Sequence, residues 1–126
     1  MLGYKNTIAL VLLLMASACK KPHNTLTVNI TNHASVTAED VKLYVKGAYV
    51  SQYIDSLSLP NMDVGQTHSQ TWDLNHLYNT DGDCKLYYRL DTVLTKYYFA
   101  TFEAGHLRNH NADLMIYDDS LTYHGY

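Results

Sequence analysis

The amino-acid sequence predicts an all-β fold in which short antiparallel strands form a sandwich. Apolar and polar residues alternate with a period of two along most of the chain after residue 25. Turn-forming residues interrupt this alternation at intervals of roughly ten residues. The pattern of the domain predicts no helix beyond one helical turn at residues 74–78. A closed barrel would give the same patterns, so both architectures stay open.

The first half of the domain contains four of the expected strands. Residues 25–31 alternate Leu, Val and Ile with Thr and Asn, and residues 41–46 alternate Val and Leu with Lys and Tyr. Residues 49–59 predict a strand with an irregular middle, and residues 66–74 predict a further extended segment. A turn cluster at residues 60–65 separates the last two. In each strand, one face is expected to pack on a core and the other to contact water.

The second half adds strands at residues 84–91, 96–102 and 112–117, and a last one around Leu121 and Tyr123. Seven or eight short strands of this kind are typical of an antiparallel immunoglobulin-like β-sandwich. Its core is expected to rest largely on three aromatic residues, Trp72, Tyr88 and Phe99.

Length and composition limit the classes of function. A chain of 126 residues allows one domain. Nine Lys and Arg against twelve Asp and Glu give a net charge of −3, which argues against a nucleic-acid partner. Two cysteines cannot build a disulfide framework, so the fold must rest on its hydrophobic core.

Residues 1–18 are typical of a secretory signal peptide. Lys5 precedes an unbroken run of apolar and small residues at 8–18. In a helix this run would rise only about 16 Å, which is about half of a bilayer core and too short to span it. A basic start, a short apolar run and small residues before a boundary indicate a leader that is removed on export.

The sequence Ala16-Ser17-Ala18-Cys19 resembles the lipobox of bacterial lipoproteins, with Ala16 where that family usually has Leu. The resemblance implies that the sulfur of Cys19 carries a diacylglyceryl group and that the leader is cut just before it. Residues 19–25 would then be the lipidated cysteine and its tether, and residues 26–126 the sandwich domain. We therefore expect a cell-envelope protein, lipid-anchored to a bacterial membrane and facing the periplasm. The alternative is an ordinary secreted chain with a free thiol at Cys19.

A second resemblance concerns the domain itself. Residues 27–47 (TVNITNHASVTAEDVKLYVKG) and 59–74 (LPNMDVGQTHSQTWDL) look like the bacterial cell-adhesion-related sandwich domains. Those domains share a V-x-I-x-N start, a V-K-L-Y-V-x-G second strand and a turn of the L-x-x-G-Q-S kind. The resemblance covers about the first half of the mature chain and implies the sandwich alone, because a fold does not fix a function.

Twelve tyrosines are the most unusual feature of the composition. The alternation predicts that Tyr44, Tyr87 and Tyr97 point away from the core. An exposed Tyr offers a large contact area with a polar tip, so these three are expected to form a binding face for a protein or glycan partner. The alternative is that they are ordinary strand residues, half-buried by their neighbours.

Seven histidines raise the hypothesis of a metal site. His106 and His110 have the i, i+4 spacing that places two ligands on one side of a helix, and His68 and His76 are the weaker candidates. The first pair lies among Gly and Asn residues that are typical of a loop. We therefore expect solvated loop histidines and a half-buried His68 in place of a metal site.

The sequence contains no recognisable catalytic motif. It has no Gly-x-Ser-x-Gly segment, and Cys84 is expected to pack inward beside Leu86 as a small apolar residue. We therefore expect a non-enzymatic protein without a cofactor that works by binding or structure, through its strand faces and the loops at residues 32–35, 75–83 and 103–111. The alternative is a lipoprotein that binds a small ligand, either a carbohydrate or a metal.

Overall fold

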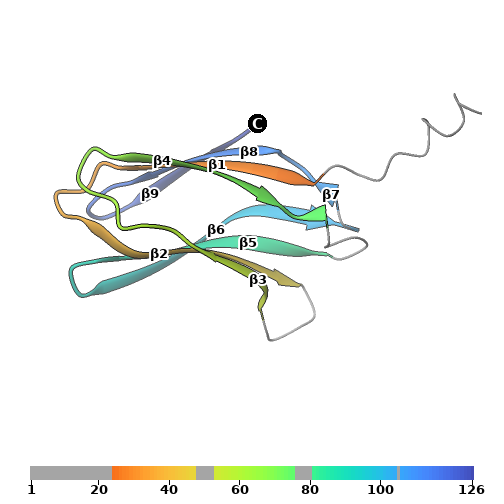
Figure 1. Ribbon diagram of the computed structural model, residues 1–126, viewed down its shortest axis with the longest axis horizontal. Helices are drawn as coiled ribbons and strands as arrows, with labels where there is room; N and C mark the ends of the chain where they lie inside the picture. Colours follow the sequence, from red (N-terminus) through yellow and green to blue (C-terminus); the bar gives the residue numbers. More distant parts are fainter. Residues whose placement is uncertain (1–23, 48–52, 76–80, 105) are drawn as a thin grey trace, which may run out of the picture.

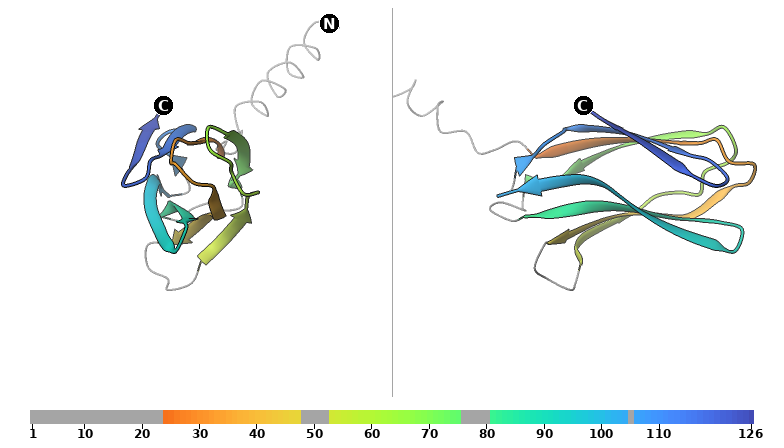
Figure 2. Two further views of the ribbon diagram at one scale, coloured as in Figure 1. Left: turned by 90° about the vertical axis from the view of Figure 1, so that its left-hand side faces the viewer. Right: turned by 180° about the vertical axis from the view of Figure 1, so that it is seen from behind.

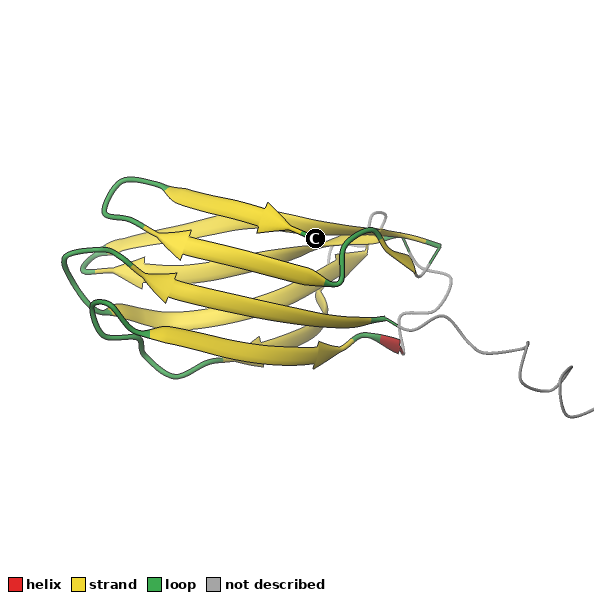
Figure 3. Cartoon of the chain, turned by 90° about the horizontal axis from the view of Figure 1, so that it is seen from above, coloured by secondary structure: helices red, strands yellow, loops and turns green. Residues whose placement is uncertain are grey.

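The computed structural model describes residues 24–47, 53–75, 81–104 and 106–126. These residues form two packed sheets whose strands run along the long axis of the domain, with the connections at its two ends (Figure 1, Figure 3). The strands are β1 (Thr25–Asn32), β2 (Ala38–Gly47), β3 (Tyr53–Ser58), β4 (Thr67–Asp73), β5 (Gly82–Leu90), β6 (Val93–Glu103), β7 (His106–Leu107), β8 (Asn111–Ile116) and β9 (Leu121–Gly125).

The all-β sandwich predicted from the sequence is confirmed, with nine described strands in place of seven or eight. The shortest strand is β7, whose two residues pair with the end of β6 and are too few to leave an alternating pattern. Among the described strands, no ladder joins one sheet to the other. The architecture is therefore a sandwich and not a closed barrel.

The order of the strands differs from the expected immunoglobulin-like arrangement. One sheet has the order β4-β1-β8-β9 and the other the order β3-β2-β5-β6-β7. The first two strands of an immunoglobulin domain share a sheet, whereas β1 and β2 lie in different sheets here. The pairs are antiparallel except for β1 with β8, which run parallel. Alternation along a strand is a local signal and does not reveal which distant strand lies beside it.

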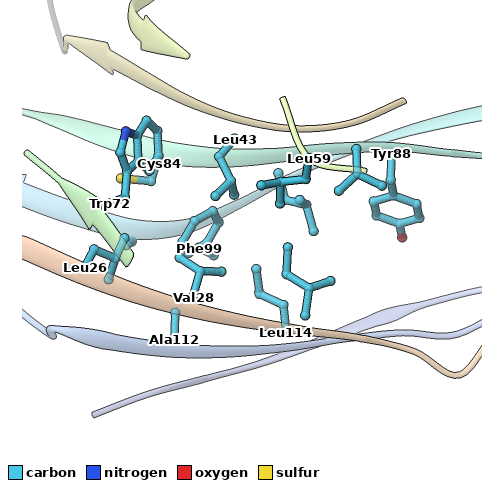
Figure 4. Close-up of a cluster of buried hydrophobic side chains, with 14 of the residues drawn as sticks. Leu26, Val28, Leu43, Leu59, Trp72, Cys84, Tyr88, Phe99, Ala112 and Leu114 are labelled. Atoms are coloured by element: carbon cyan, nitrogen blue, oxygen red, sulfur yellow. The ribbon is translucent and has the colours of Figure 1, made fainter. Parts of the chain in front are cut away.

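Apolar side chains fill the space between the two sheets (Figure 4). Every second residue of β1 is buried, as the alternation predicts. The three predicted core aromatics are confirmed, because Trp72, Tyr88 and Phe99 are only 6%, 2% and 5% exposed. The indole nitrogen Nε1 of Trp72 in β4 donates a hydrogen bond of 3.3 Å to Asp55 in β3, which links the two sheets along one side.

Asn32, the last residue of β1, ties two loops together at the end of the sandwich opposite the start of β1. Its side chain is fully buried. Nδ2 donates to the carbonyl oxygens of Val36 and Met62, and Oδ1 accepts from the N–H of Ala34, all at 2.9 Å. The N–H of Gly65 donates to the Asn32 carbonyl at 2.7 Å, with a φ of 82° that favours glycine. Every polar atom of this buried amide therefore has a partner.

Some sequence-based predictions fall outside the described residues. They are the signal peptide at residues 1–18, the lipidation of Cys19 and the metal candidate His76. Within the ranges that the structure does describe, no helix is long and apolar enough to cross a membrane.

Candidate binding surface

Tyrosine and lysine alternate on the outer face of the five-stranded sheet, over β2, β5 and β6. Cross-strand pairing places six residues in two rows, Tyr44, Lys85 and Tyr98 in the first and Lys42, Tyr87 and Lys96 in the second. The residue type alternates along each row and between the rows, so the six form a checkerboard. We call these six residues the tyrosine–lysine face.

The six side chains point outward because their chain neighbours fill the core. Leu43 and Val45 flank Tyr44 in β2, and Cys84 and Leu86 flank Lys85 in β5; all four are fully buried. Successive side chains of a strand point to opposite sides of the sheet, so the residues between these core positions lie on the outer side.

Two ring contacts order the tyrosine–lysine face. The rings of Tyr44 and Tyr87 meet edge to face, with centroids 4.8 Å apart and planes 70° apart. The Nζ of Lys85 lies 4.4 Å from the centroid of the Tyr98 ring, a cation–π contact. Lys85 is only 4% exposed on this outer side of the sheet, whereas Tyr98 is 54% exposed. A buried charge thus supports an aromatic ring that is open to a partner.

The charge of this face is opposite to that of the rest of the domain. All twelve acidic residues lie in the described ranges, against six of the nine Lys and Arg. Three of those six are lysines of the tyrosine–lysine face, of which Lys85 is nearly buried, and Lys46 follows them on β2 directly opposite Asp83. Arg89, also on the outer side, is already paired with Glu39 and with Asp40, the second at 3.1 Å. The accessible charges of the face are those of Lys42 and Lys96, and on an acidic domain these two favour an anionic partner.

The structure corrects the predicted orientation of Tyr97. Tyr44 and Tyr87 lie on the outer side as expected, but Tyr97 is opposite Leu86 and packs against the core. Its neighbour Tyr98 is the outward residue of β6. The sequence could have predicted this orientation. Phe99 was expected in the core, and Tyr97 lies two residues before it, so both side chains should point to the same side of the strand.

The histidine candidates do not converge in the structure. His68 is half-buried on β4, and its Nε2 is a buried atom without a hydrogen-bond partner. His106 is exposed in β7, and His110 is exposed with its Nδ1 3.2 Å from the carbonyl oxygen of Thr25. No helix carries the last two, so their spacing does not place them on one side. Among the described residues, no group of three or more His, Cys, Asp or Glu could hold a metal ion.

The thiol of Cys84 is expected to be unreactive in the folded protein. Burial raises its pKa from 9.0 to about 12, and the carboxylate of Asp83 adds to the shift. At pH 8 the folded chain should therefore contain about a thousandfold less thiolate at this position than the unfolded chain. Alkylation by iodoacetamide, followed by mass spectrometry of the peptide that contains Cys84, should be slow until guanidinium unfolds the protein. Rapid alkylation of the native chain would contradict the burial.

The same shift predicts a dependence of stability on pH. Since the unfolded chain loses the Cys84 proton first, the free energy of unfolding should fall as the pH rises above 9.

No protein-family model matches this chain, and no curated protein matches it either. The resemblances to bacterial lipoproteins and to adhesion-related sandwich domains stay predictions from the sequence.

Proposed function

We propose that this chain is a non-enzymatic lipoprotein of a bacterial cell envelope, which binds an acidic glycan through the tyrosine–lysine face. The checkerboard of three tyrosines and three lysines is the observation that carries the proposal. Its chemistry offers aromatic rings for stacking contacts and ammonium groups for ion pairs. Binding is therefore the activity that these six side chains support.

A linear glycan suits the shape and spacing of the face. The outer side of a sheet offers an extended surface, which matches an extended polymer better than a compact ligand. Tyr44 and Tyr98 lie two strand spacings apart, roughly 9 to 10 Å, which is close to the length of two linked sugar rings. The C–H surface of a sugar ring packs on an aromatic ring, and a carboxylate on the sugar pairs with Lys42 beside Tyr44 or with Lys96 beside Tyr98.

The direction of the strands supports a tether at one end of the domain. β1 starts at one end and runs along the long axis to the other (Figure 1). An anchor at Cys19 would precede this start by only a few residues. The tyrosine–lysine face lies along the side of the sandwich, so a lipid at the end would leave it accessible to a polymer in the envelope.

The anchor is tested by substituting the two cysteines separately. In a bacterial host grown with radiolabelled palmitate, the parent chain should take up label and sediment with membranes. Cys19→Ser should lose both, because the thioether cannot form. Cys84→Ala removes the other sulfur from the buried core and should keep the label. Label on the Cys19→Ser chain, or a free thiol at Cys19 in the purified parent, would refute lipidation.

The binding activity is tested with a defined polymer. The purified full chain should bind polygalacturonate, a linear polymer with one carboxylate per sugar, and should not bind the neutral polymer dextran. Binding should weaken as salt rises from about 0.01 to 1 M, because the Debye length falls from about 30 to 3 Å. Equal binding to dextran, or none to polygalacturonate at low salt, would exclude an acidic glycan.

A further inference from the structure

The long strand β6 has one free edge. Along its whole length it pairs with β5 on one side. On the other side, among the described residues, only Phe102 and Glu103 pair, with the two residues of β7. Residues 93–101 therefore have no strand beside them. Main-chain N–H and C=O groups along such an edge are a template for another strand.

This edge also carries most of the exposed apolar surface. Of five large apolar side chains that are exposed among the described residues, three lie on β6: Val93, Leu94 and Tyr98. Val93 and Leu94 are 63% and 62% exposed. Proteins usually protect a free edge with several charges, proline, a bulge or a covering loop; in the unpaired stretch Lys96 is the only charged residue, and the one bulge, at Phe99, lies toward its end. The combination indicates an edge that another strand covers.

No hydrogen-bonded ladder joins the edge of β6 to β9, the described strand next to it in the other sheet. Figure 2 shows β6 and β9 along the same side of the sandwich, in different sheets. Three pockets of about 580, 370 and 400 Å³ follow this side, and each is lined partly by residues of β6. The rings of Phe99 and Tyr123 approach to 6.3 Å between centroids, without a hydrogen-bonded ladder between their strands. A further strand can therefore reach the edge of β6.

We propose that β6 pairs with β6 of a second copy of this chain, antiparallel, about a two-fold axis at Tyr97. The unpaired stretch, residues 93–101, is centred on Tyr97, and the bulge at Phe99 leaves residues 96–98 as the part that pairs regularly across the axis. Lys96 then lies directly opposite Tyr98 of the partner subunit, and Tyr98 opposite the partner's Lys96. The two strands meet by the same surface on both copies, as two-fold symmetry requires.

Side-chain chemistry selects this register. Lys96 opposite the partner's Tyr98 repeats the cross-strand pair that Lys85 and Tyr98 already form within one chain. A two-fold axis at Lys96 would instead place two lysines opposite each other, which is destabilising. With the axis at Tyr97, the alternation of Tyr and Lys continues without a break from one subunit into the next. The edge is therefore complementary to itself.

The size of the contact predicts a reversible dimer. Nine residues of strand extend roughly 30 Å. With a contact about 10 Å wide, which is the spacing of two packed sheets, the edge covers on the order of 300 Å² of each copy. The total is below the roughly 1,200 Å² of a typical stable interface. Chemical cross-linking, which traps a short-lived dimer, is therefore suited to detect this contact. The test needs no ligand, so its outcome is independent of whether the tyrosine–lysine face binds a glycan.

The register is tested by cross-linking mixtures of two full-length variants. Lys96→Cys mixed with Tyr98→Cys places two thiols directly opposite, about 5 Å apart at Cβ, within reach of a short bis-methanethiosulfonate reagent. Lys96→Cys mixed with Leu94→Cys is the matched control, since these positions would lie four residues or roughly 14 Å apart on the same side. Only the first mixture should give a covalent heterodimer. The parent chain has the same native cysteines and sets the background.

A second pair of variants tests the complementarity without added cysteines. Tyr98→Lys would oppose the partner's Lys96 and should weaken dimerisation at least tenfold in sedimentation equilibrium. Tyr98→Glu changes the same exposed ring but places a carboxylate opposite that lysine, and should dimerise at least as well as the parent. Circular dichroism should confirm that all variants are folded. Equal cross-linking in both mixtures, or a parent chain that stays monomeric up to millimolar concentration, would overturn the proposal.

Discussion

Replacing Asn32 with alanine is expected to lower the free energy of unfolding by about 3 to 5 kcal/mol. The buried amide makes three hydrogen bonds of 2.9 Å. Alanine would leave the carbonyl oxygen of Val36 and the N–H of Ala34 without these partners inside the protein, whereas the Met62 carbonyl would keep the N–H of Ala38 at 2.9 Å. Each buried polar group that loses its partner costs roughly 1 to 3 kcal/mol. The two loops that the amide joins should then separate.

Asn29→Ala is the matched control for Asn32→Ala. It removes the same side chain two residues earlier in β1, where the amide bonds to Ser69 at 2.6 Å and Asp113 at 2.9 Å but water can replace it. Its cost should be below about 1 kcal/mol. Urea unfolding, followed by the fluorescence of the single tryptophan, measures both. Equal losses would show that the buried network at the end of β1 has no special role.

Reversing the charge of Lys42 is expected to weaken binding of polygalacturonate by at least tenfold at low salt. Lys42 lies opposite Tyr87 in the tyrosine–lysine face, on β2, away from the free edge of β6. Lys42→Glu removes an attractive charge and adds a repulsive one beside an aromatic contact, which corresponds to about 1.4 kcal/mol or more. The difference from the parent chain should shrink in 1 M salt as the charges are screened.

Arg108→Glu is the control for the overall charge. It changes the net charge by the same two units at an exposed residue outside the tyrosine–lysine face. If position matters, Arg108→Glu should bind almost like the parent chain. Equal weakening by both variants would mean that net charge alone attracts the polymer, and the tyrosine–lysine face would no longer be the binding surface. Isothermal titration calorimetry provides both affinities.

Local alternation predicted most of the strands, but it could not predict their arrangement. The buried positions of β1, β2 and β8 follow from the two-residue period alone. The parallel contact between β1 and β8 joins Asn29 to Asp113, 84 residues apart, and no local pattern indicates such a pairing. The passage of the chain from one sheet to the other between β1 and β2 cannot be predicted from local alternation for the same reason.

The candidate surface was partly predictable. Tyr44 and Tyr87 were identified correctly as outward, because their strands alternate regularly on either side of them. β6 is irregular, since its pairing with β5 shifts between Cys84 and Lys85 and leaves Phe99 as an extra residue. Such a bulge changes which positions face the core after Phe99, whereas the inward side of Tyr97 follows from its two-residue spacing to Phe99. The role of the lysines in this face could not be predicted from the sequence, because only the cross-strand register places them beside tyrosines from other strands.

The central position of β1 has a consequence for the order in which the domain can form. One of its neighbours, β4, is synthesised soon after it, but the other, β8, ends at Ile116, near the end of the chain. The first strand must therefore wait until the chain has been made as far as Ile116 before its sheet can close. Long-range pairing of this kind slows folding. A chain with this topology should therefore fold more slowly than one whose neighbouring strands are consecutive.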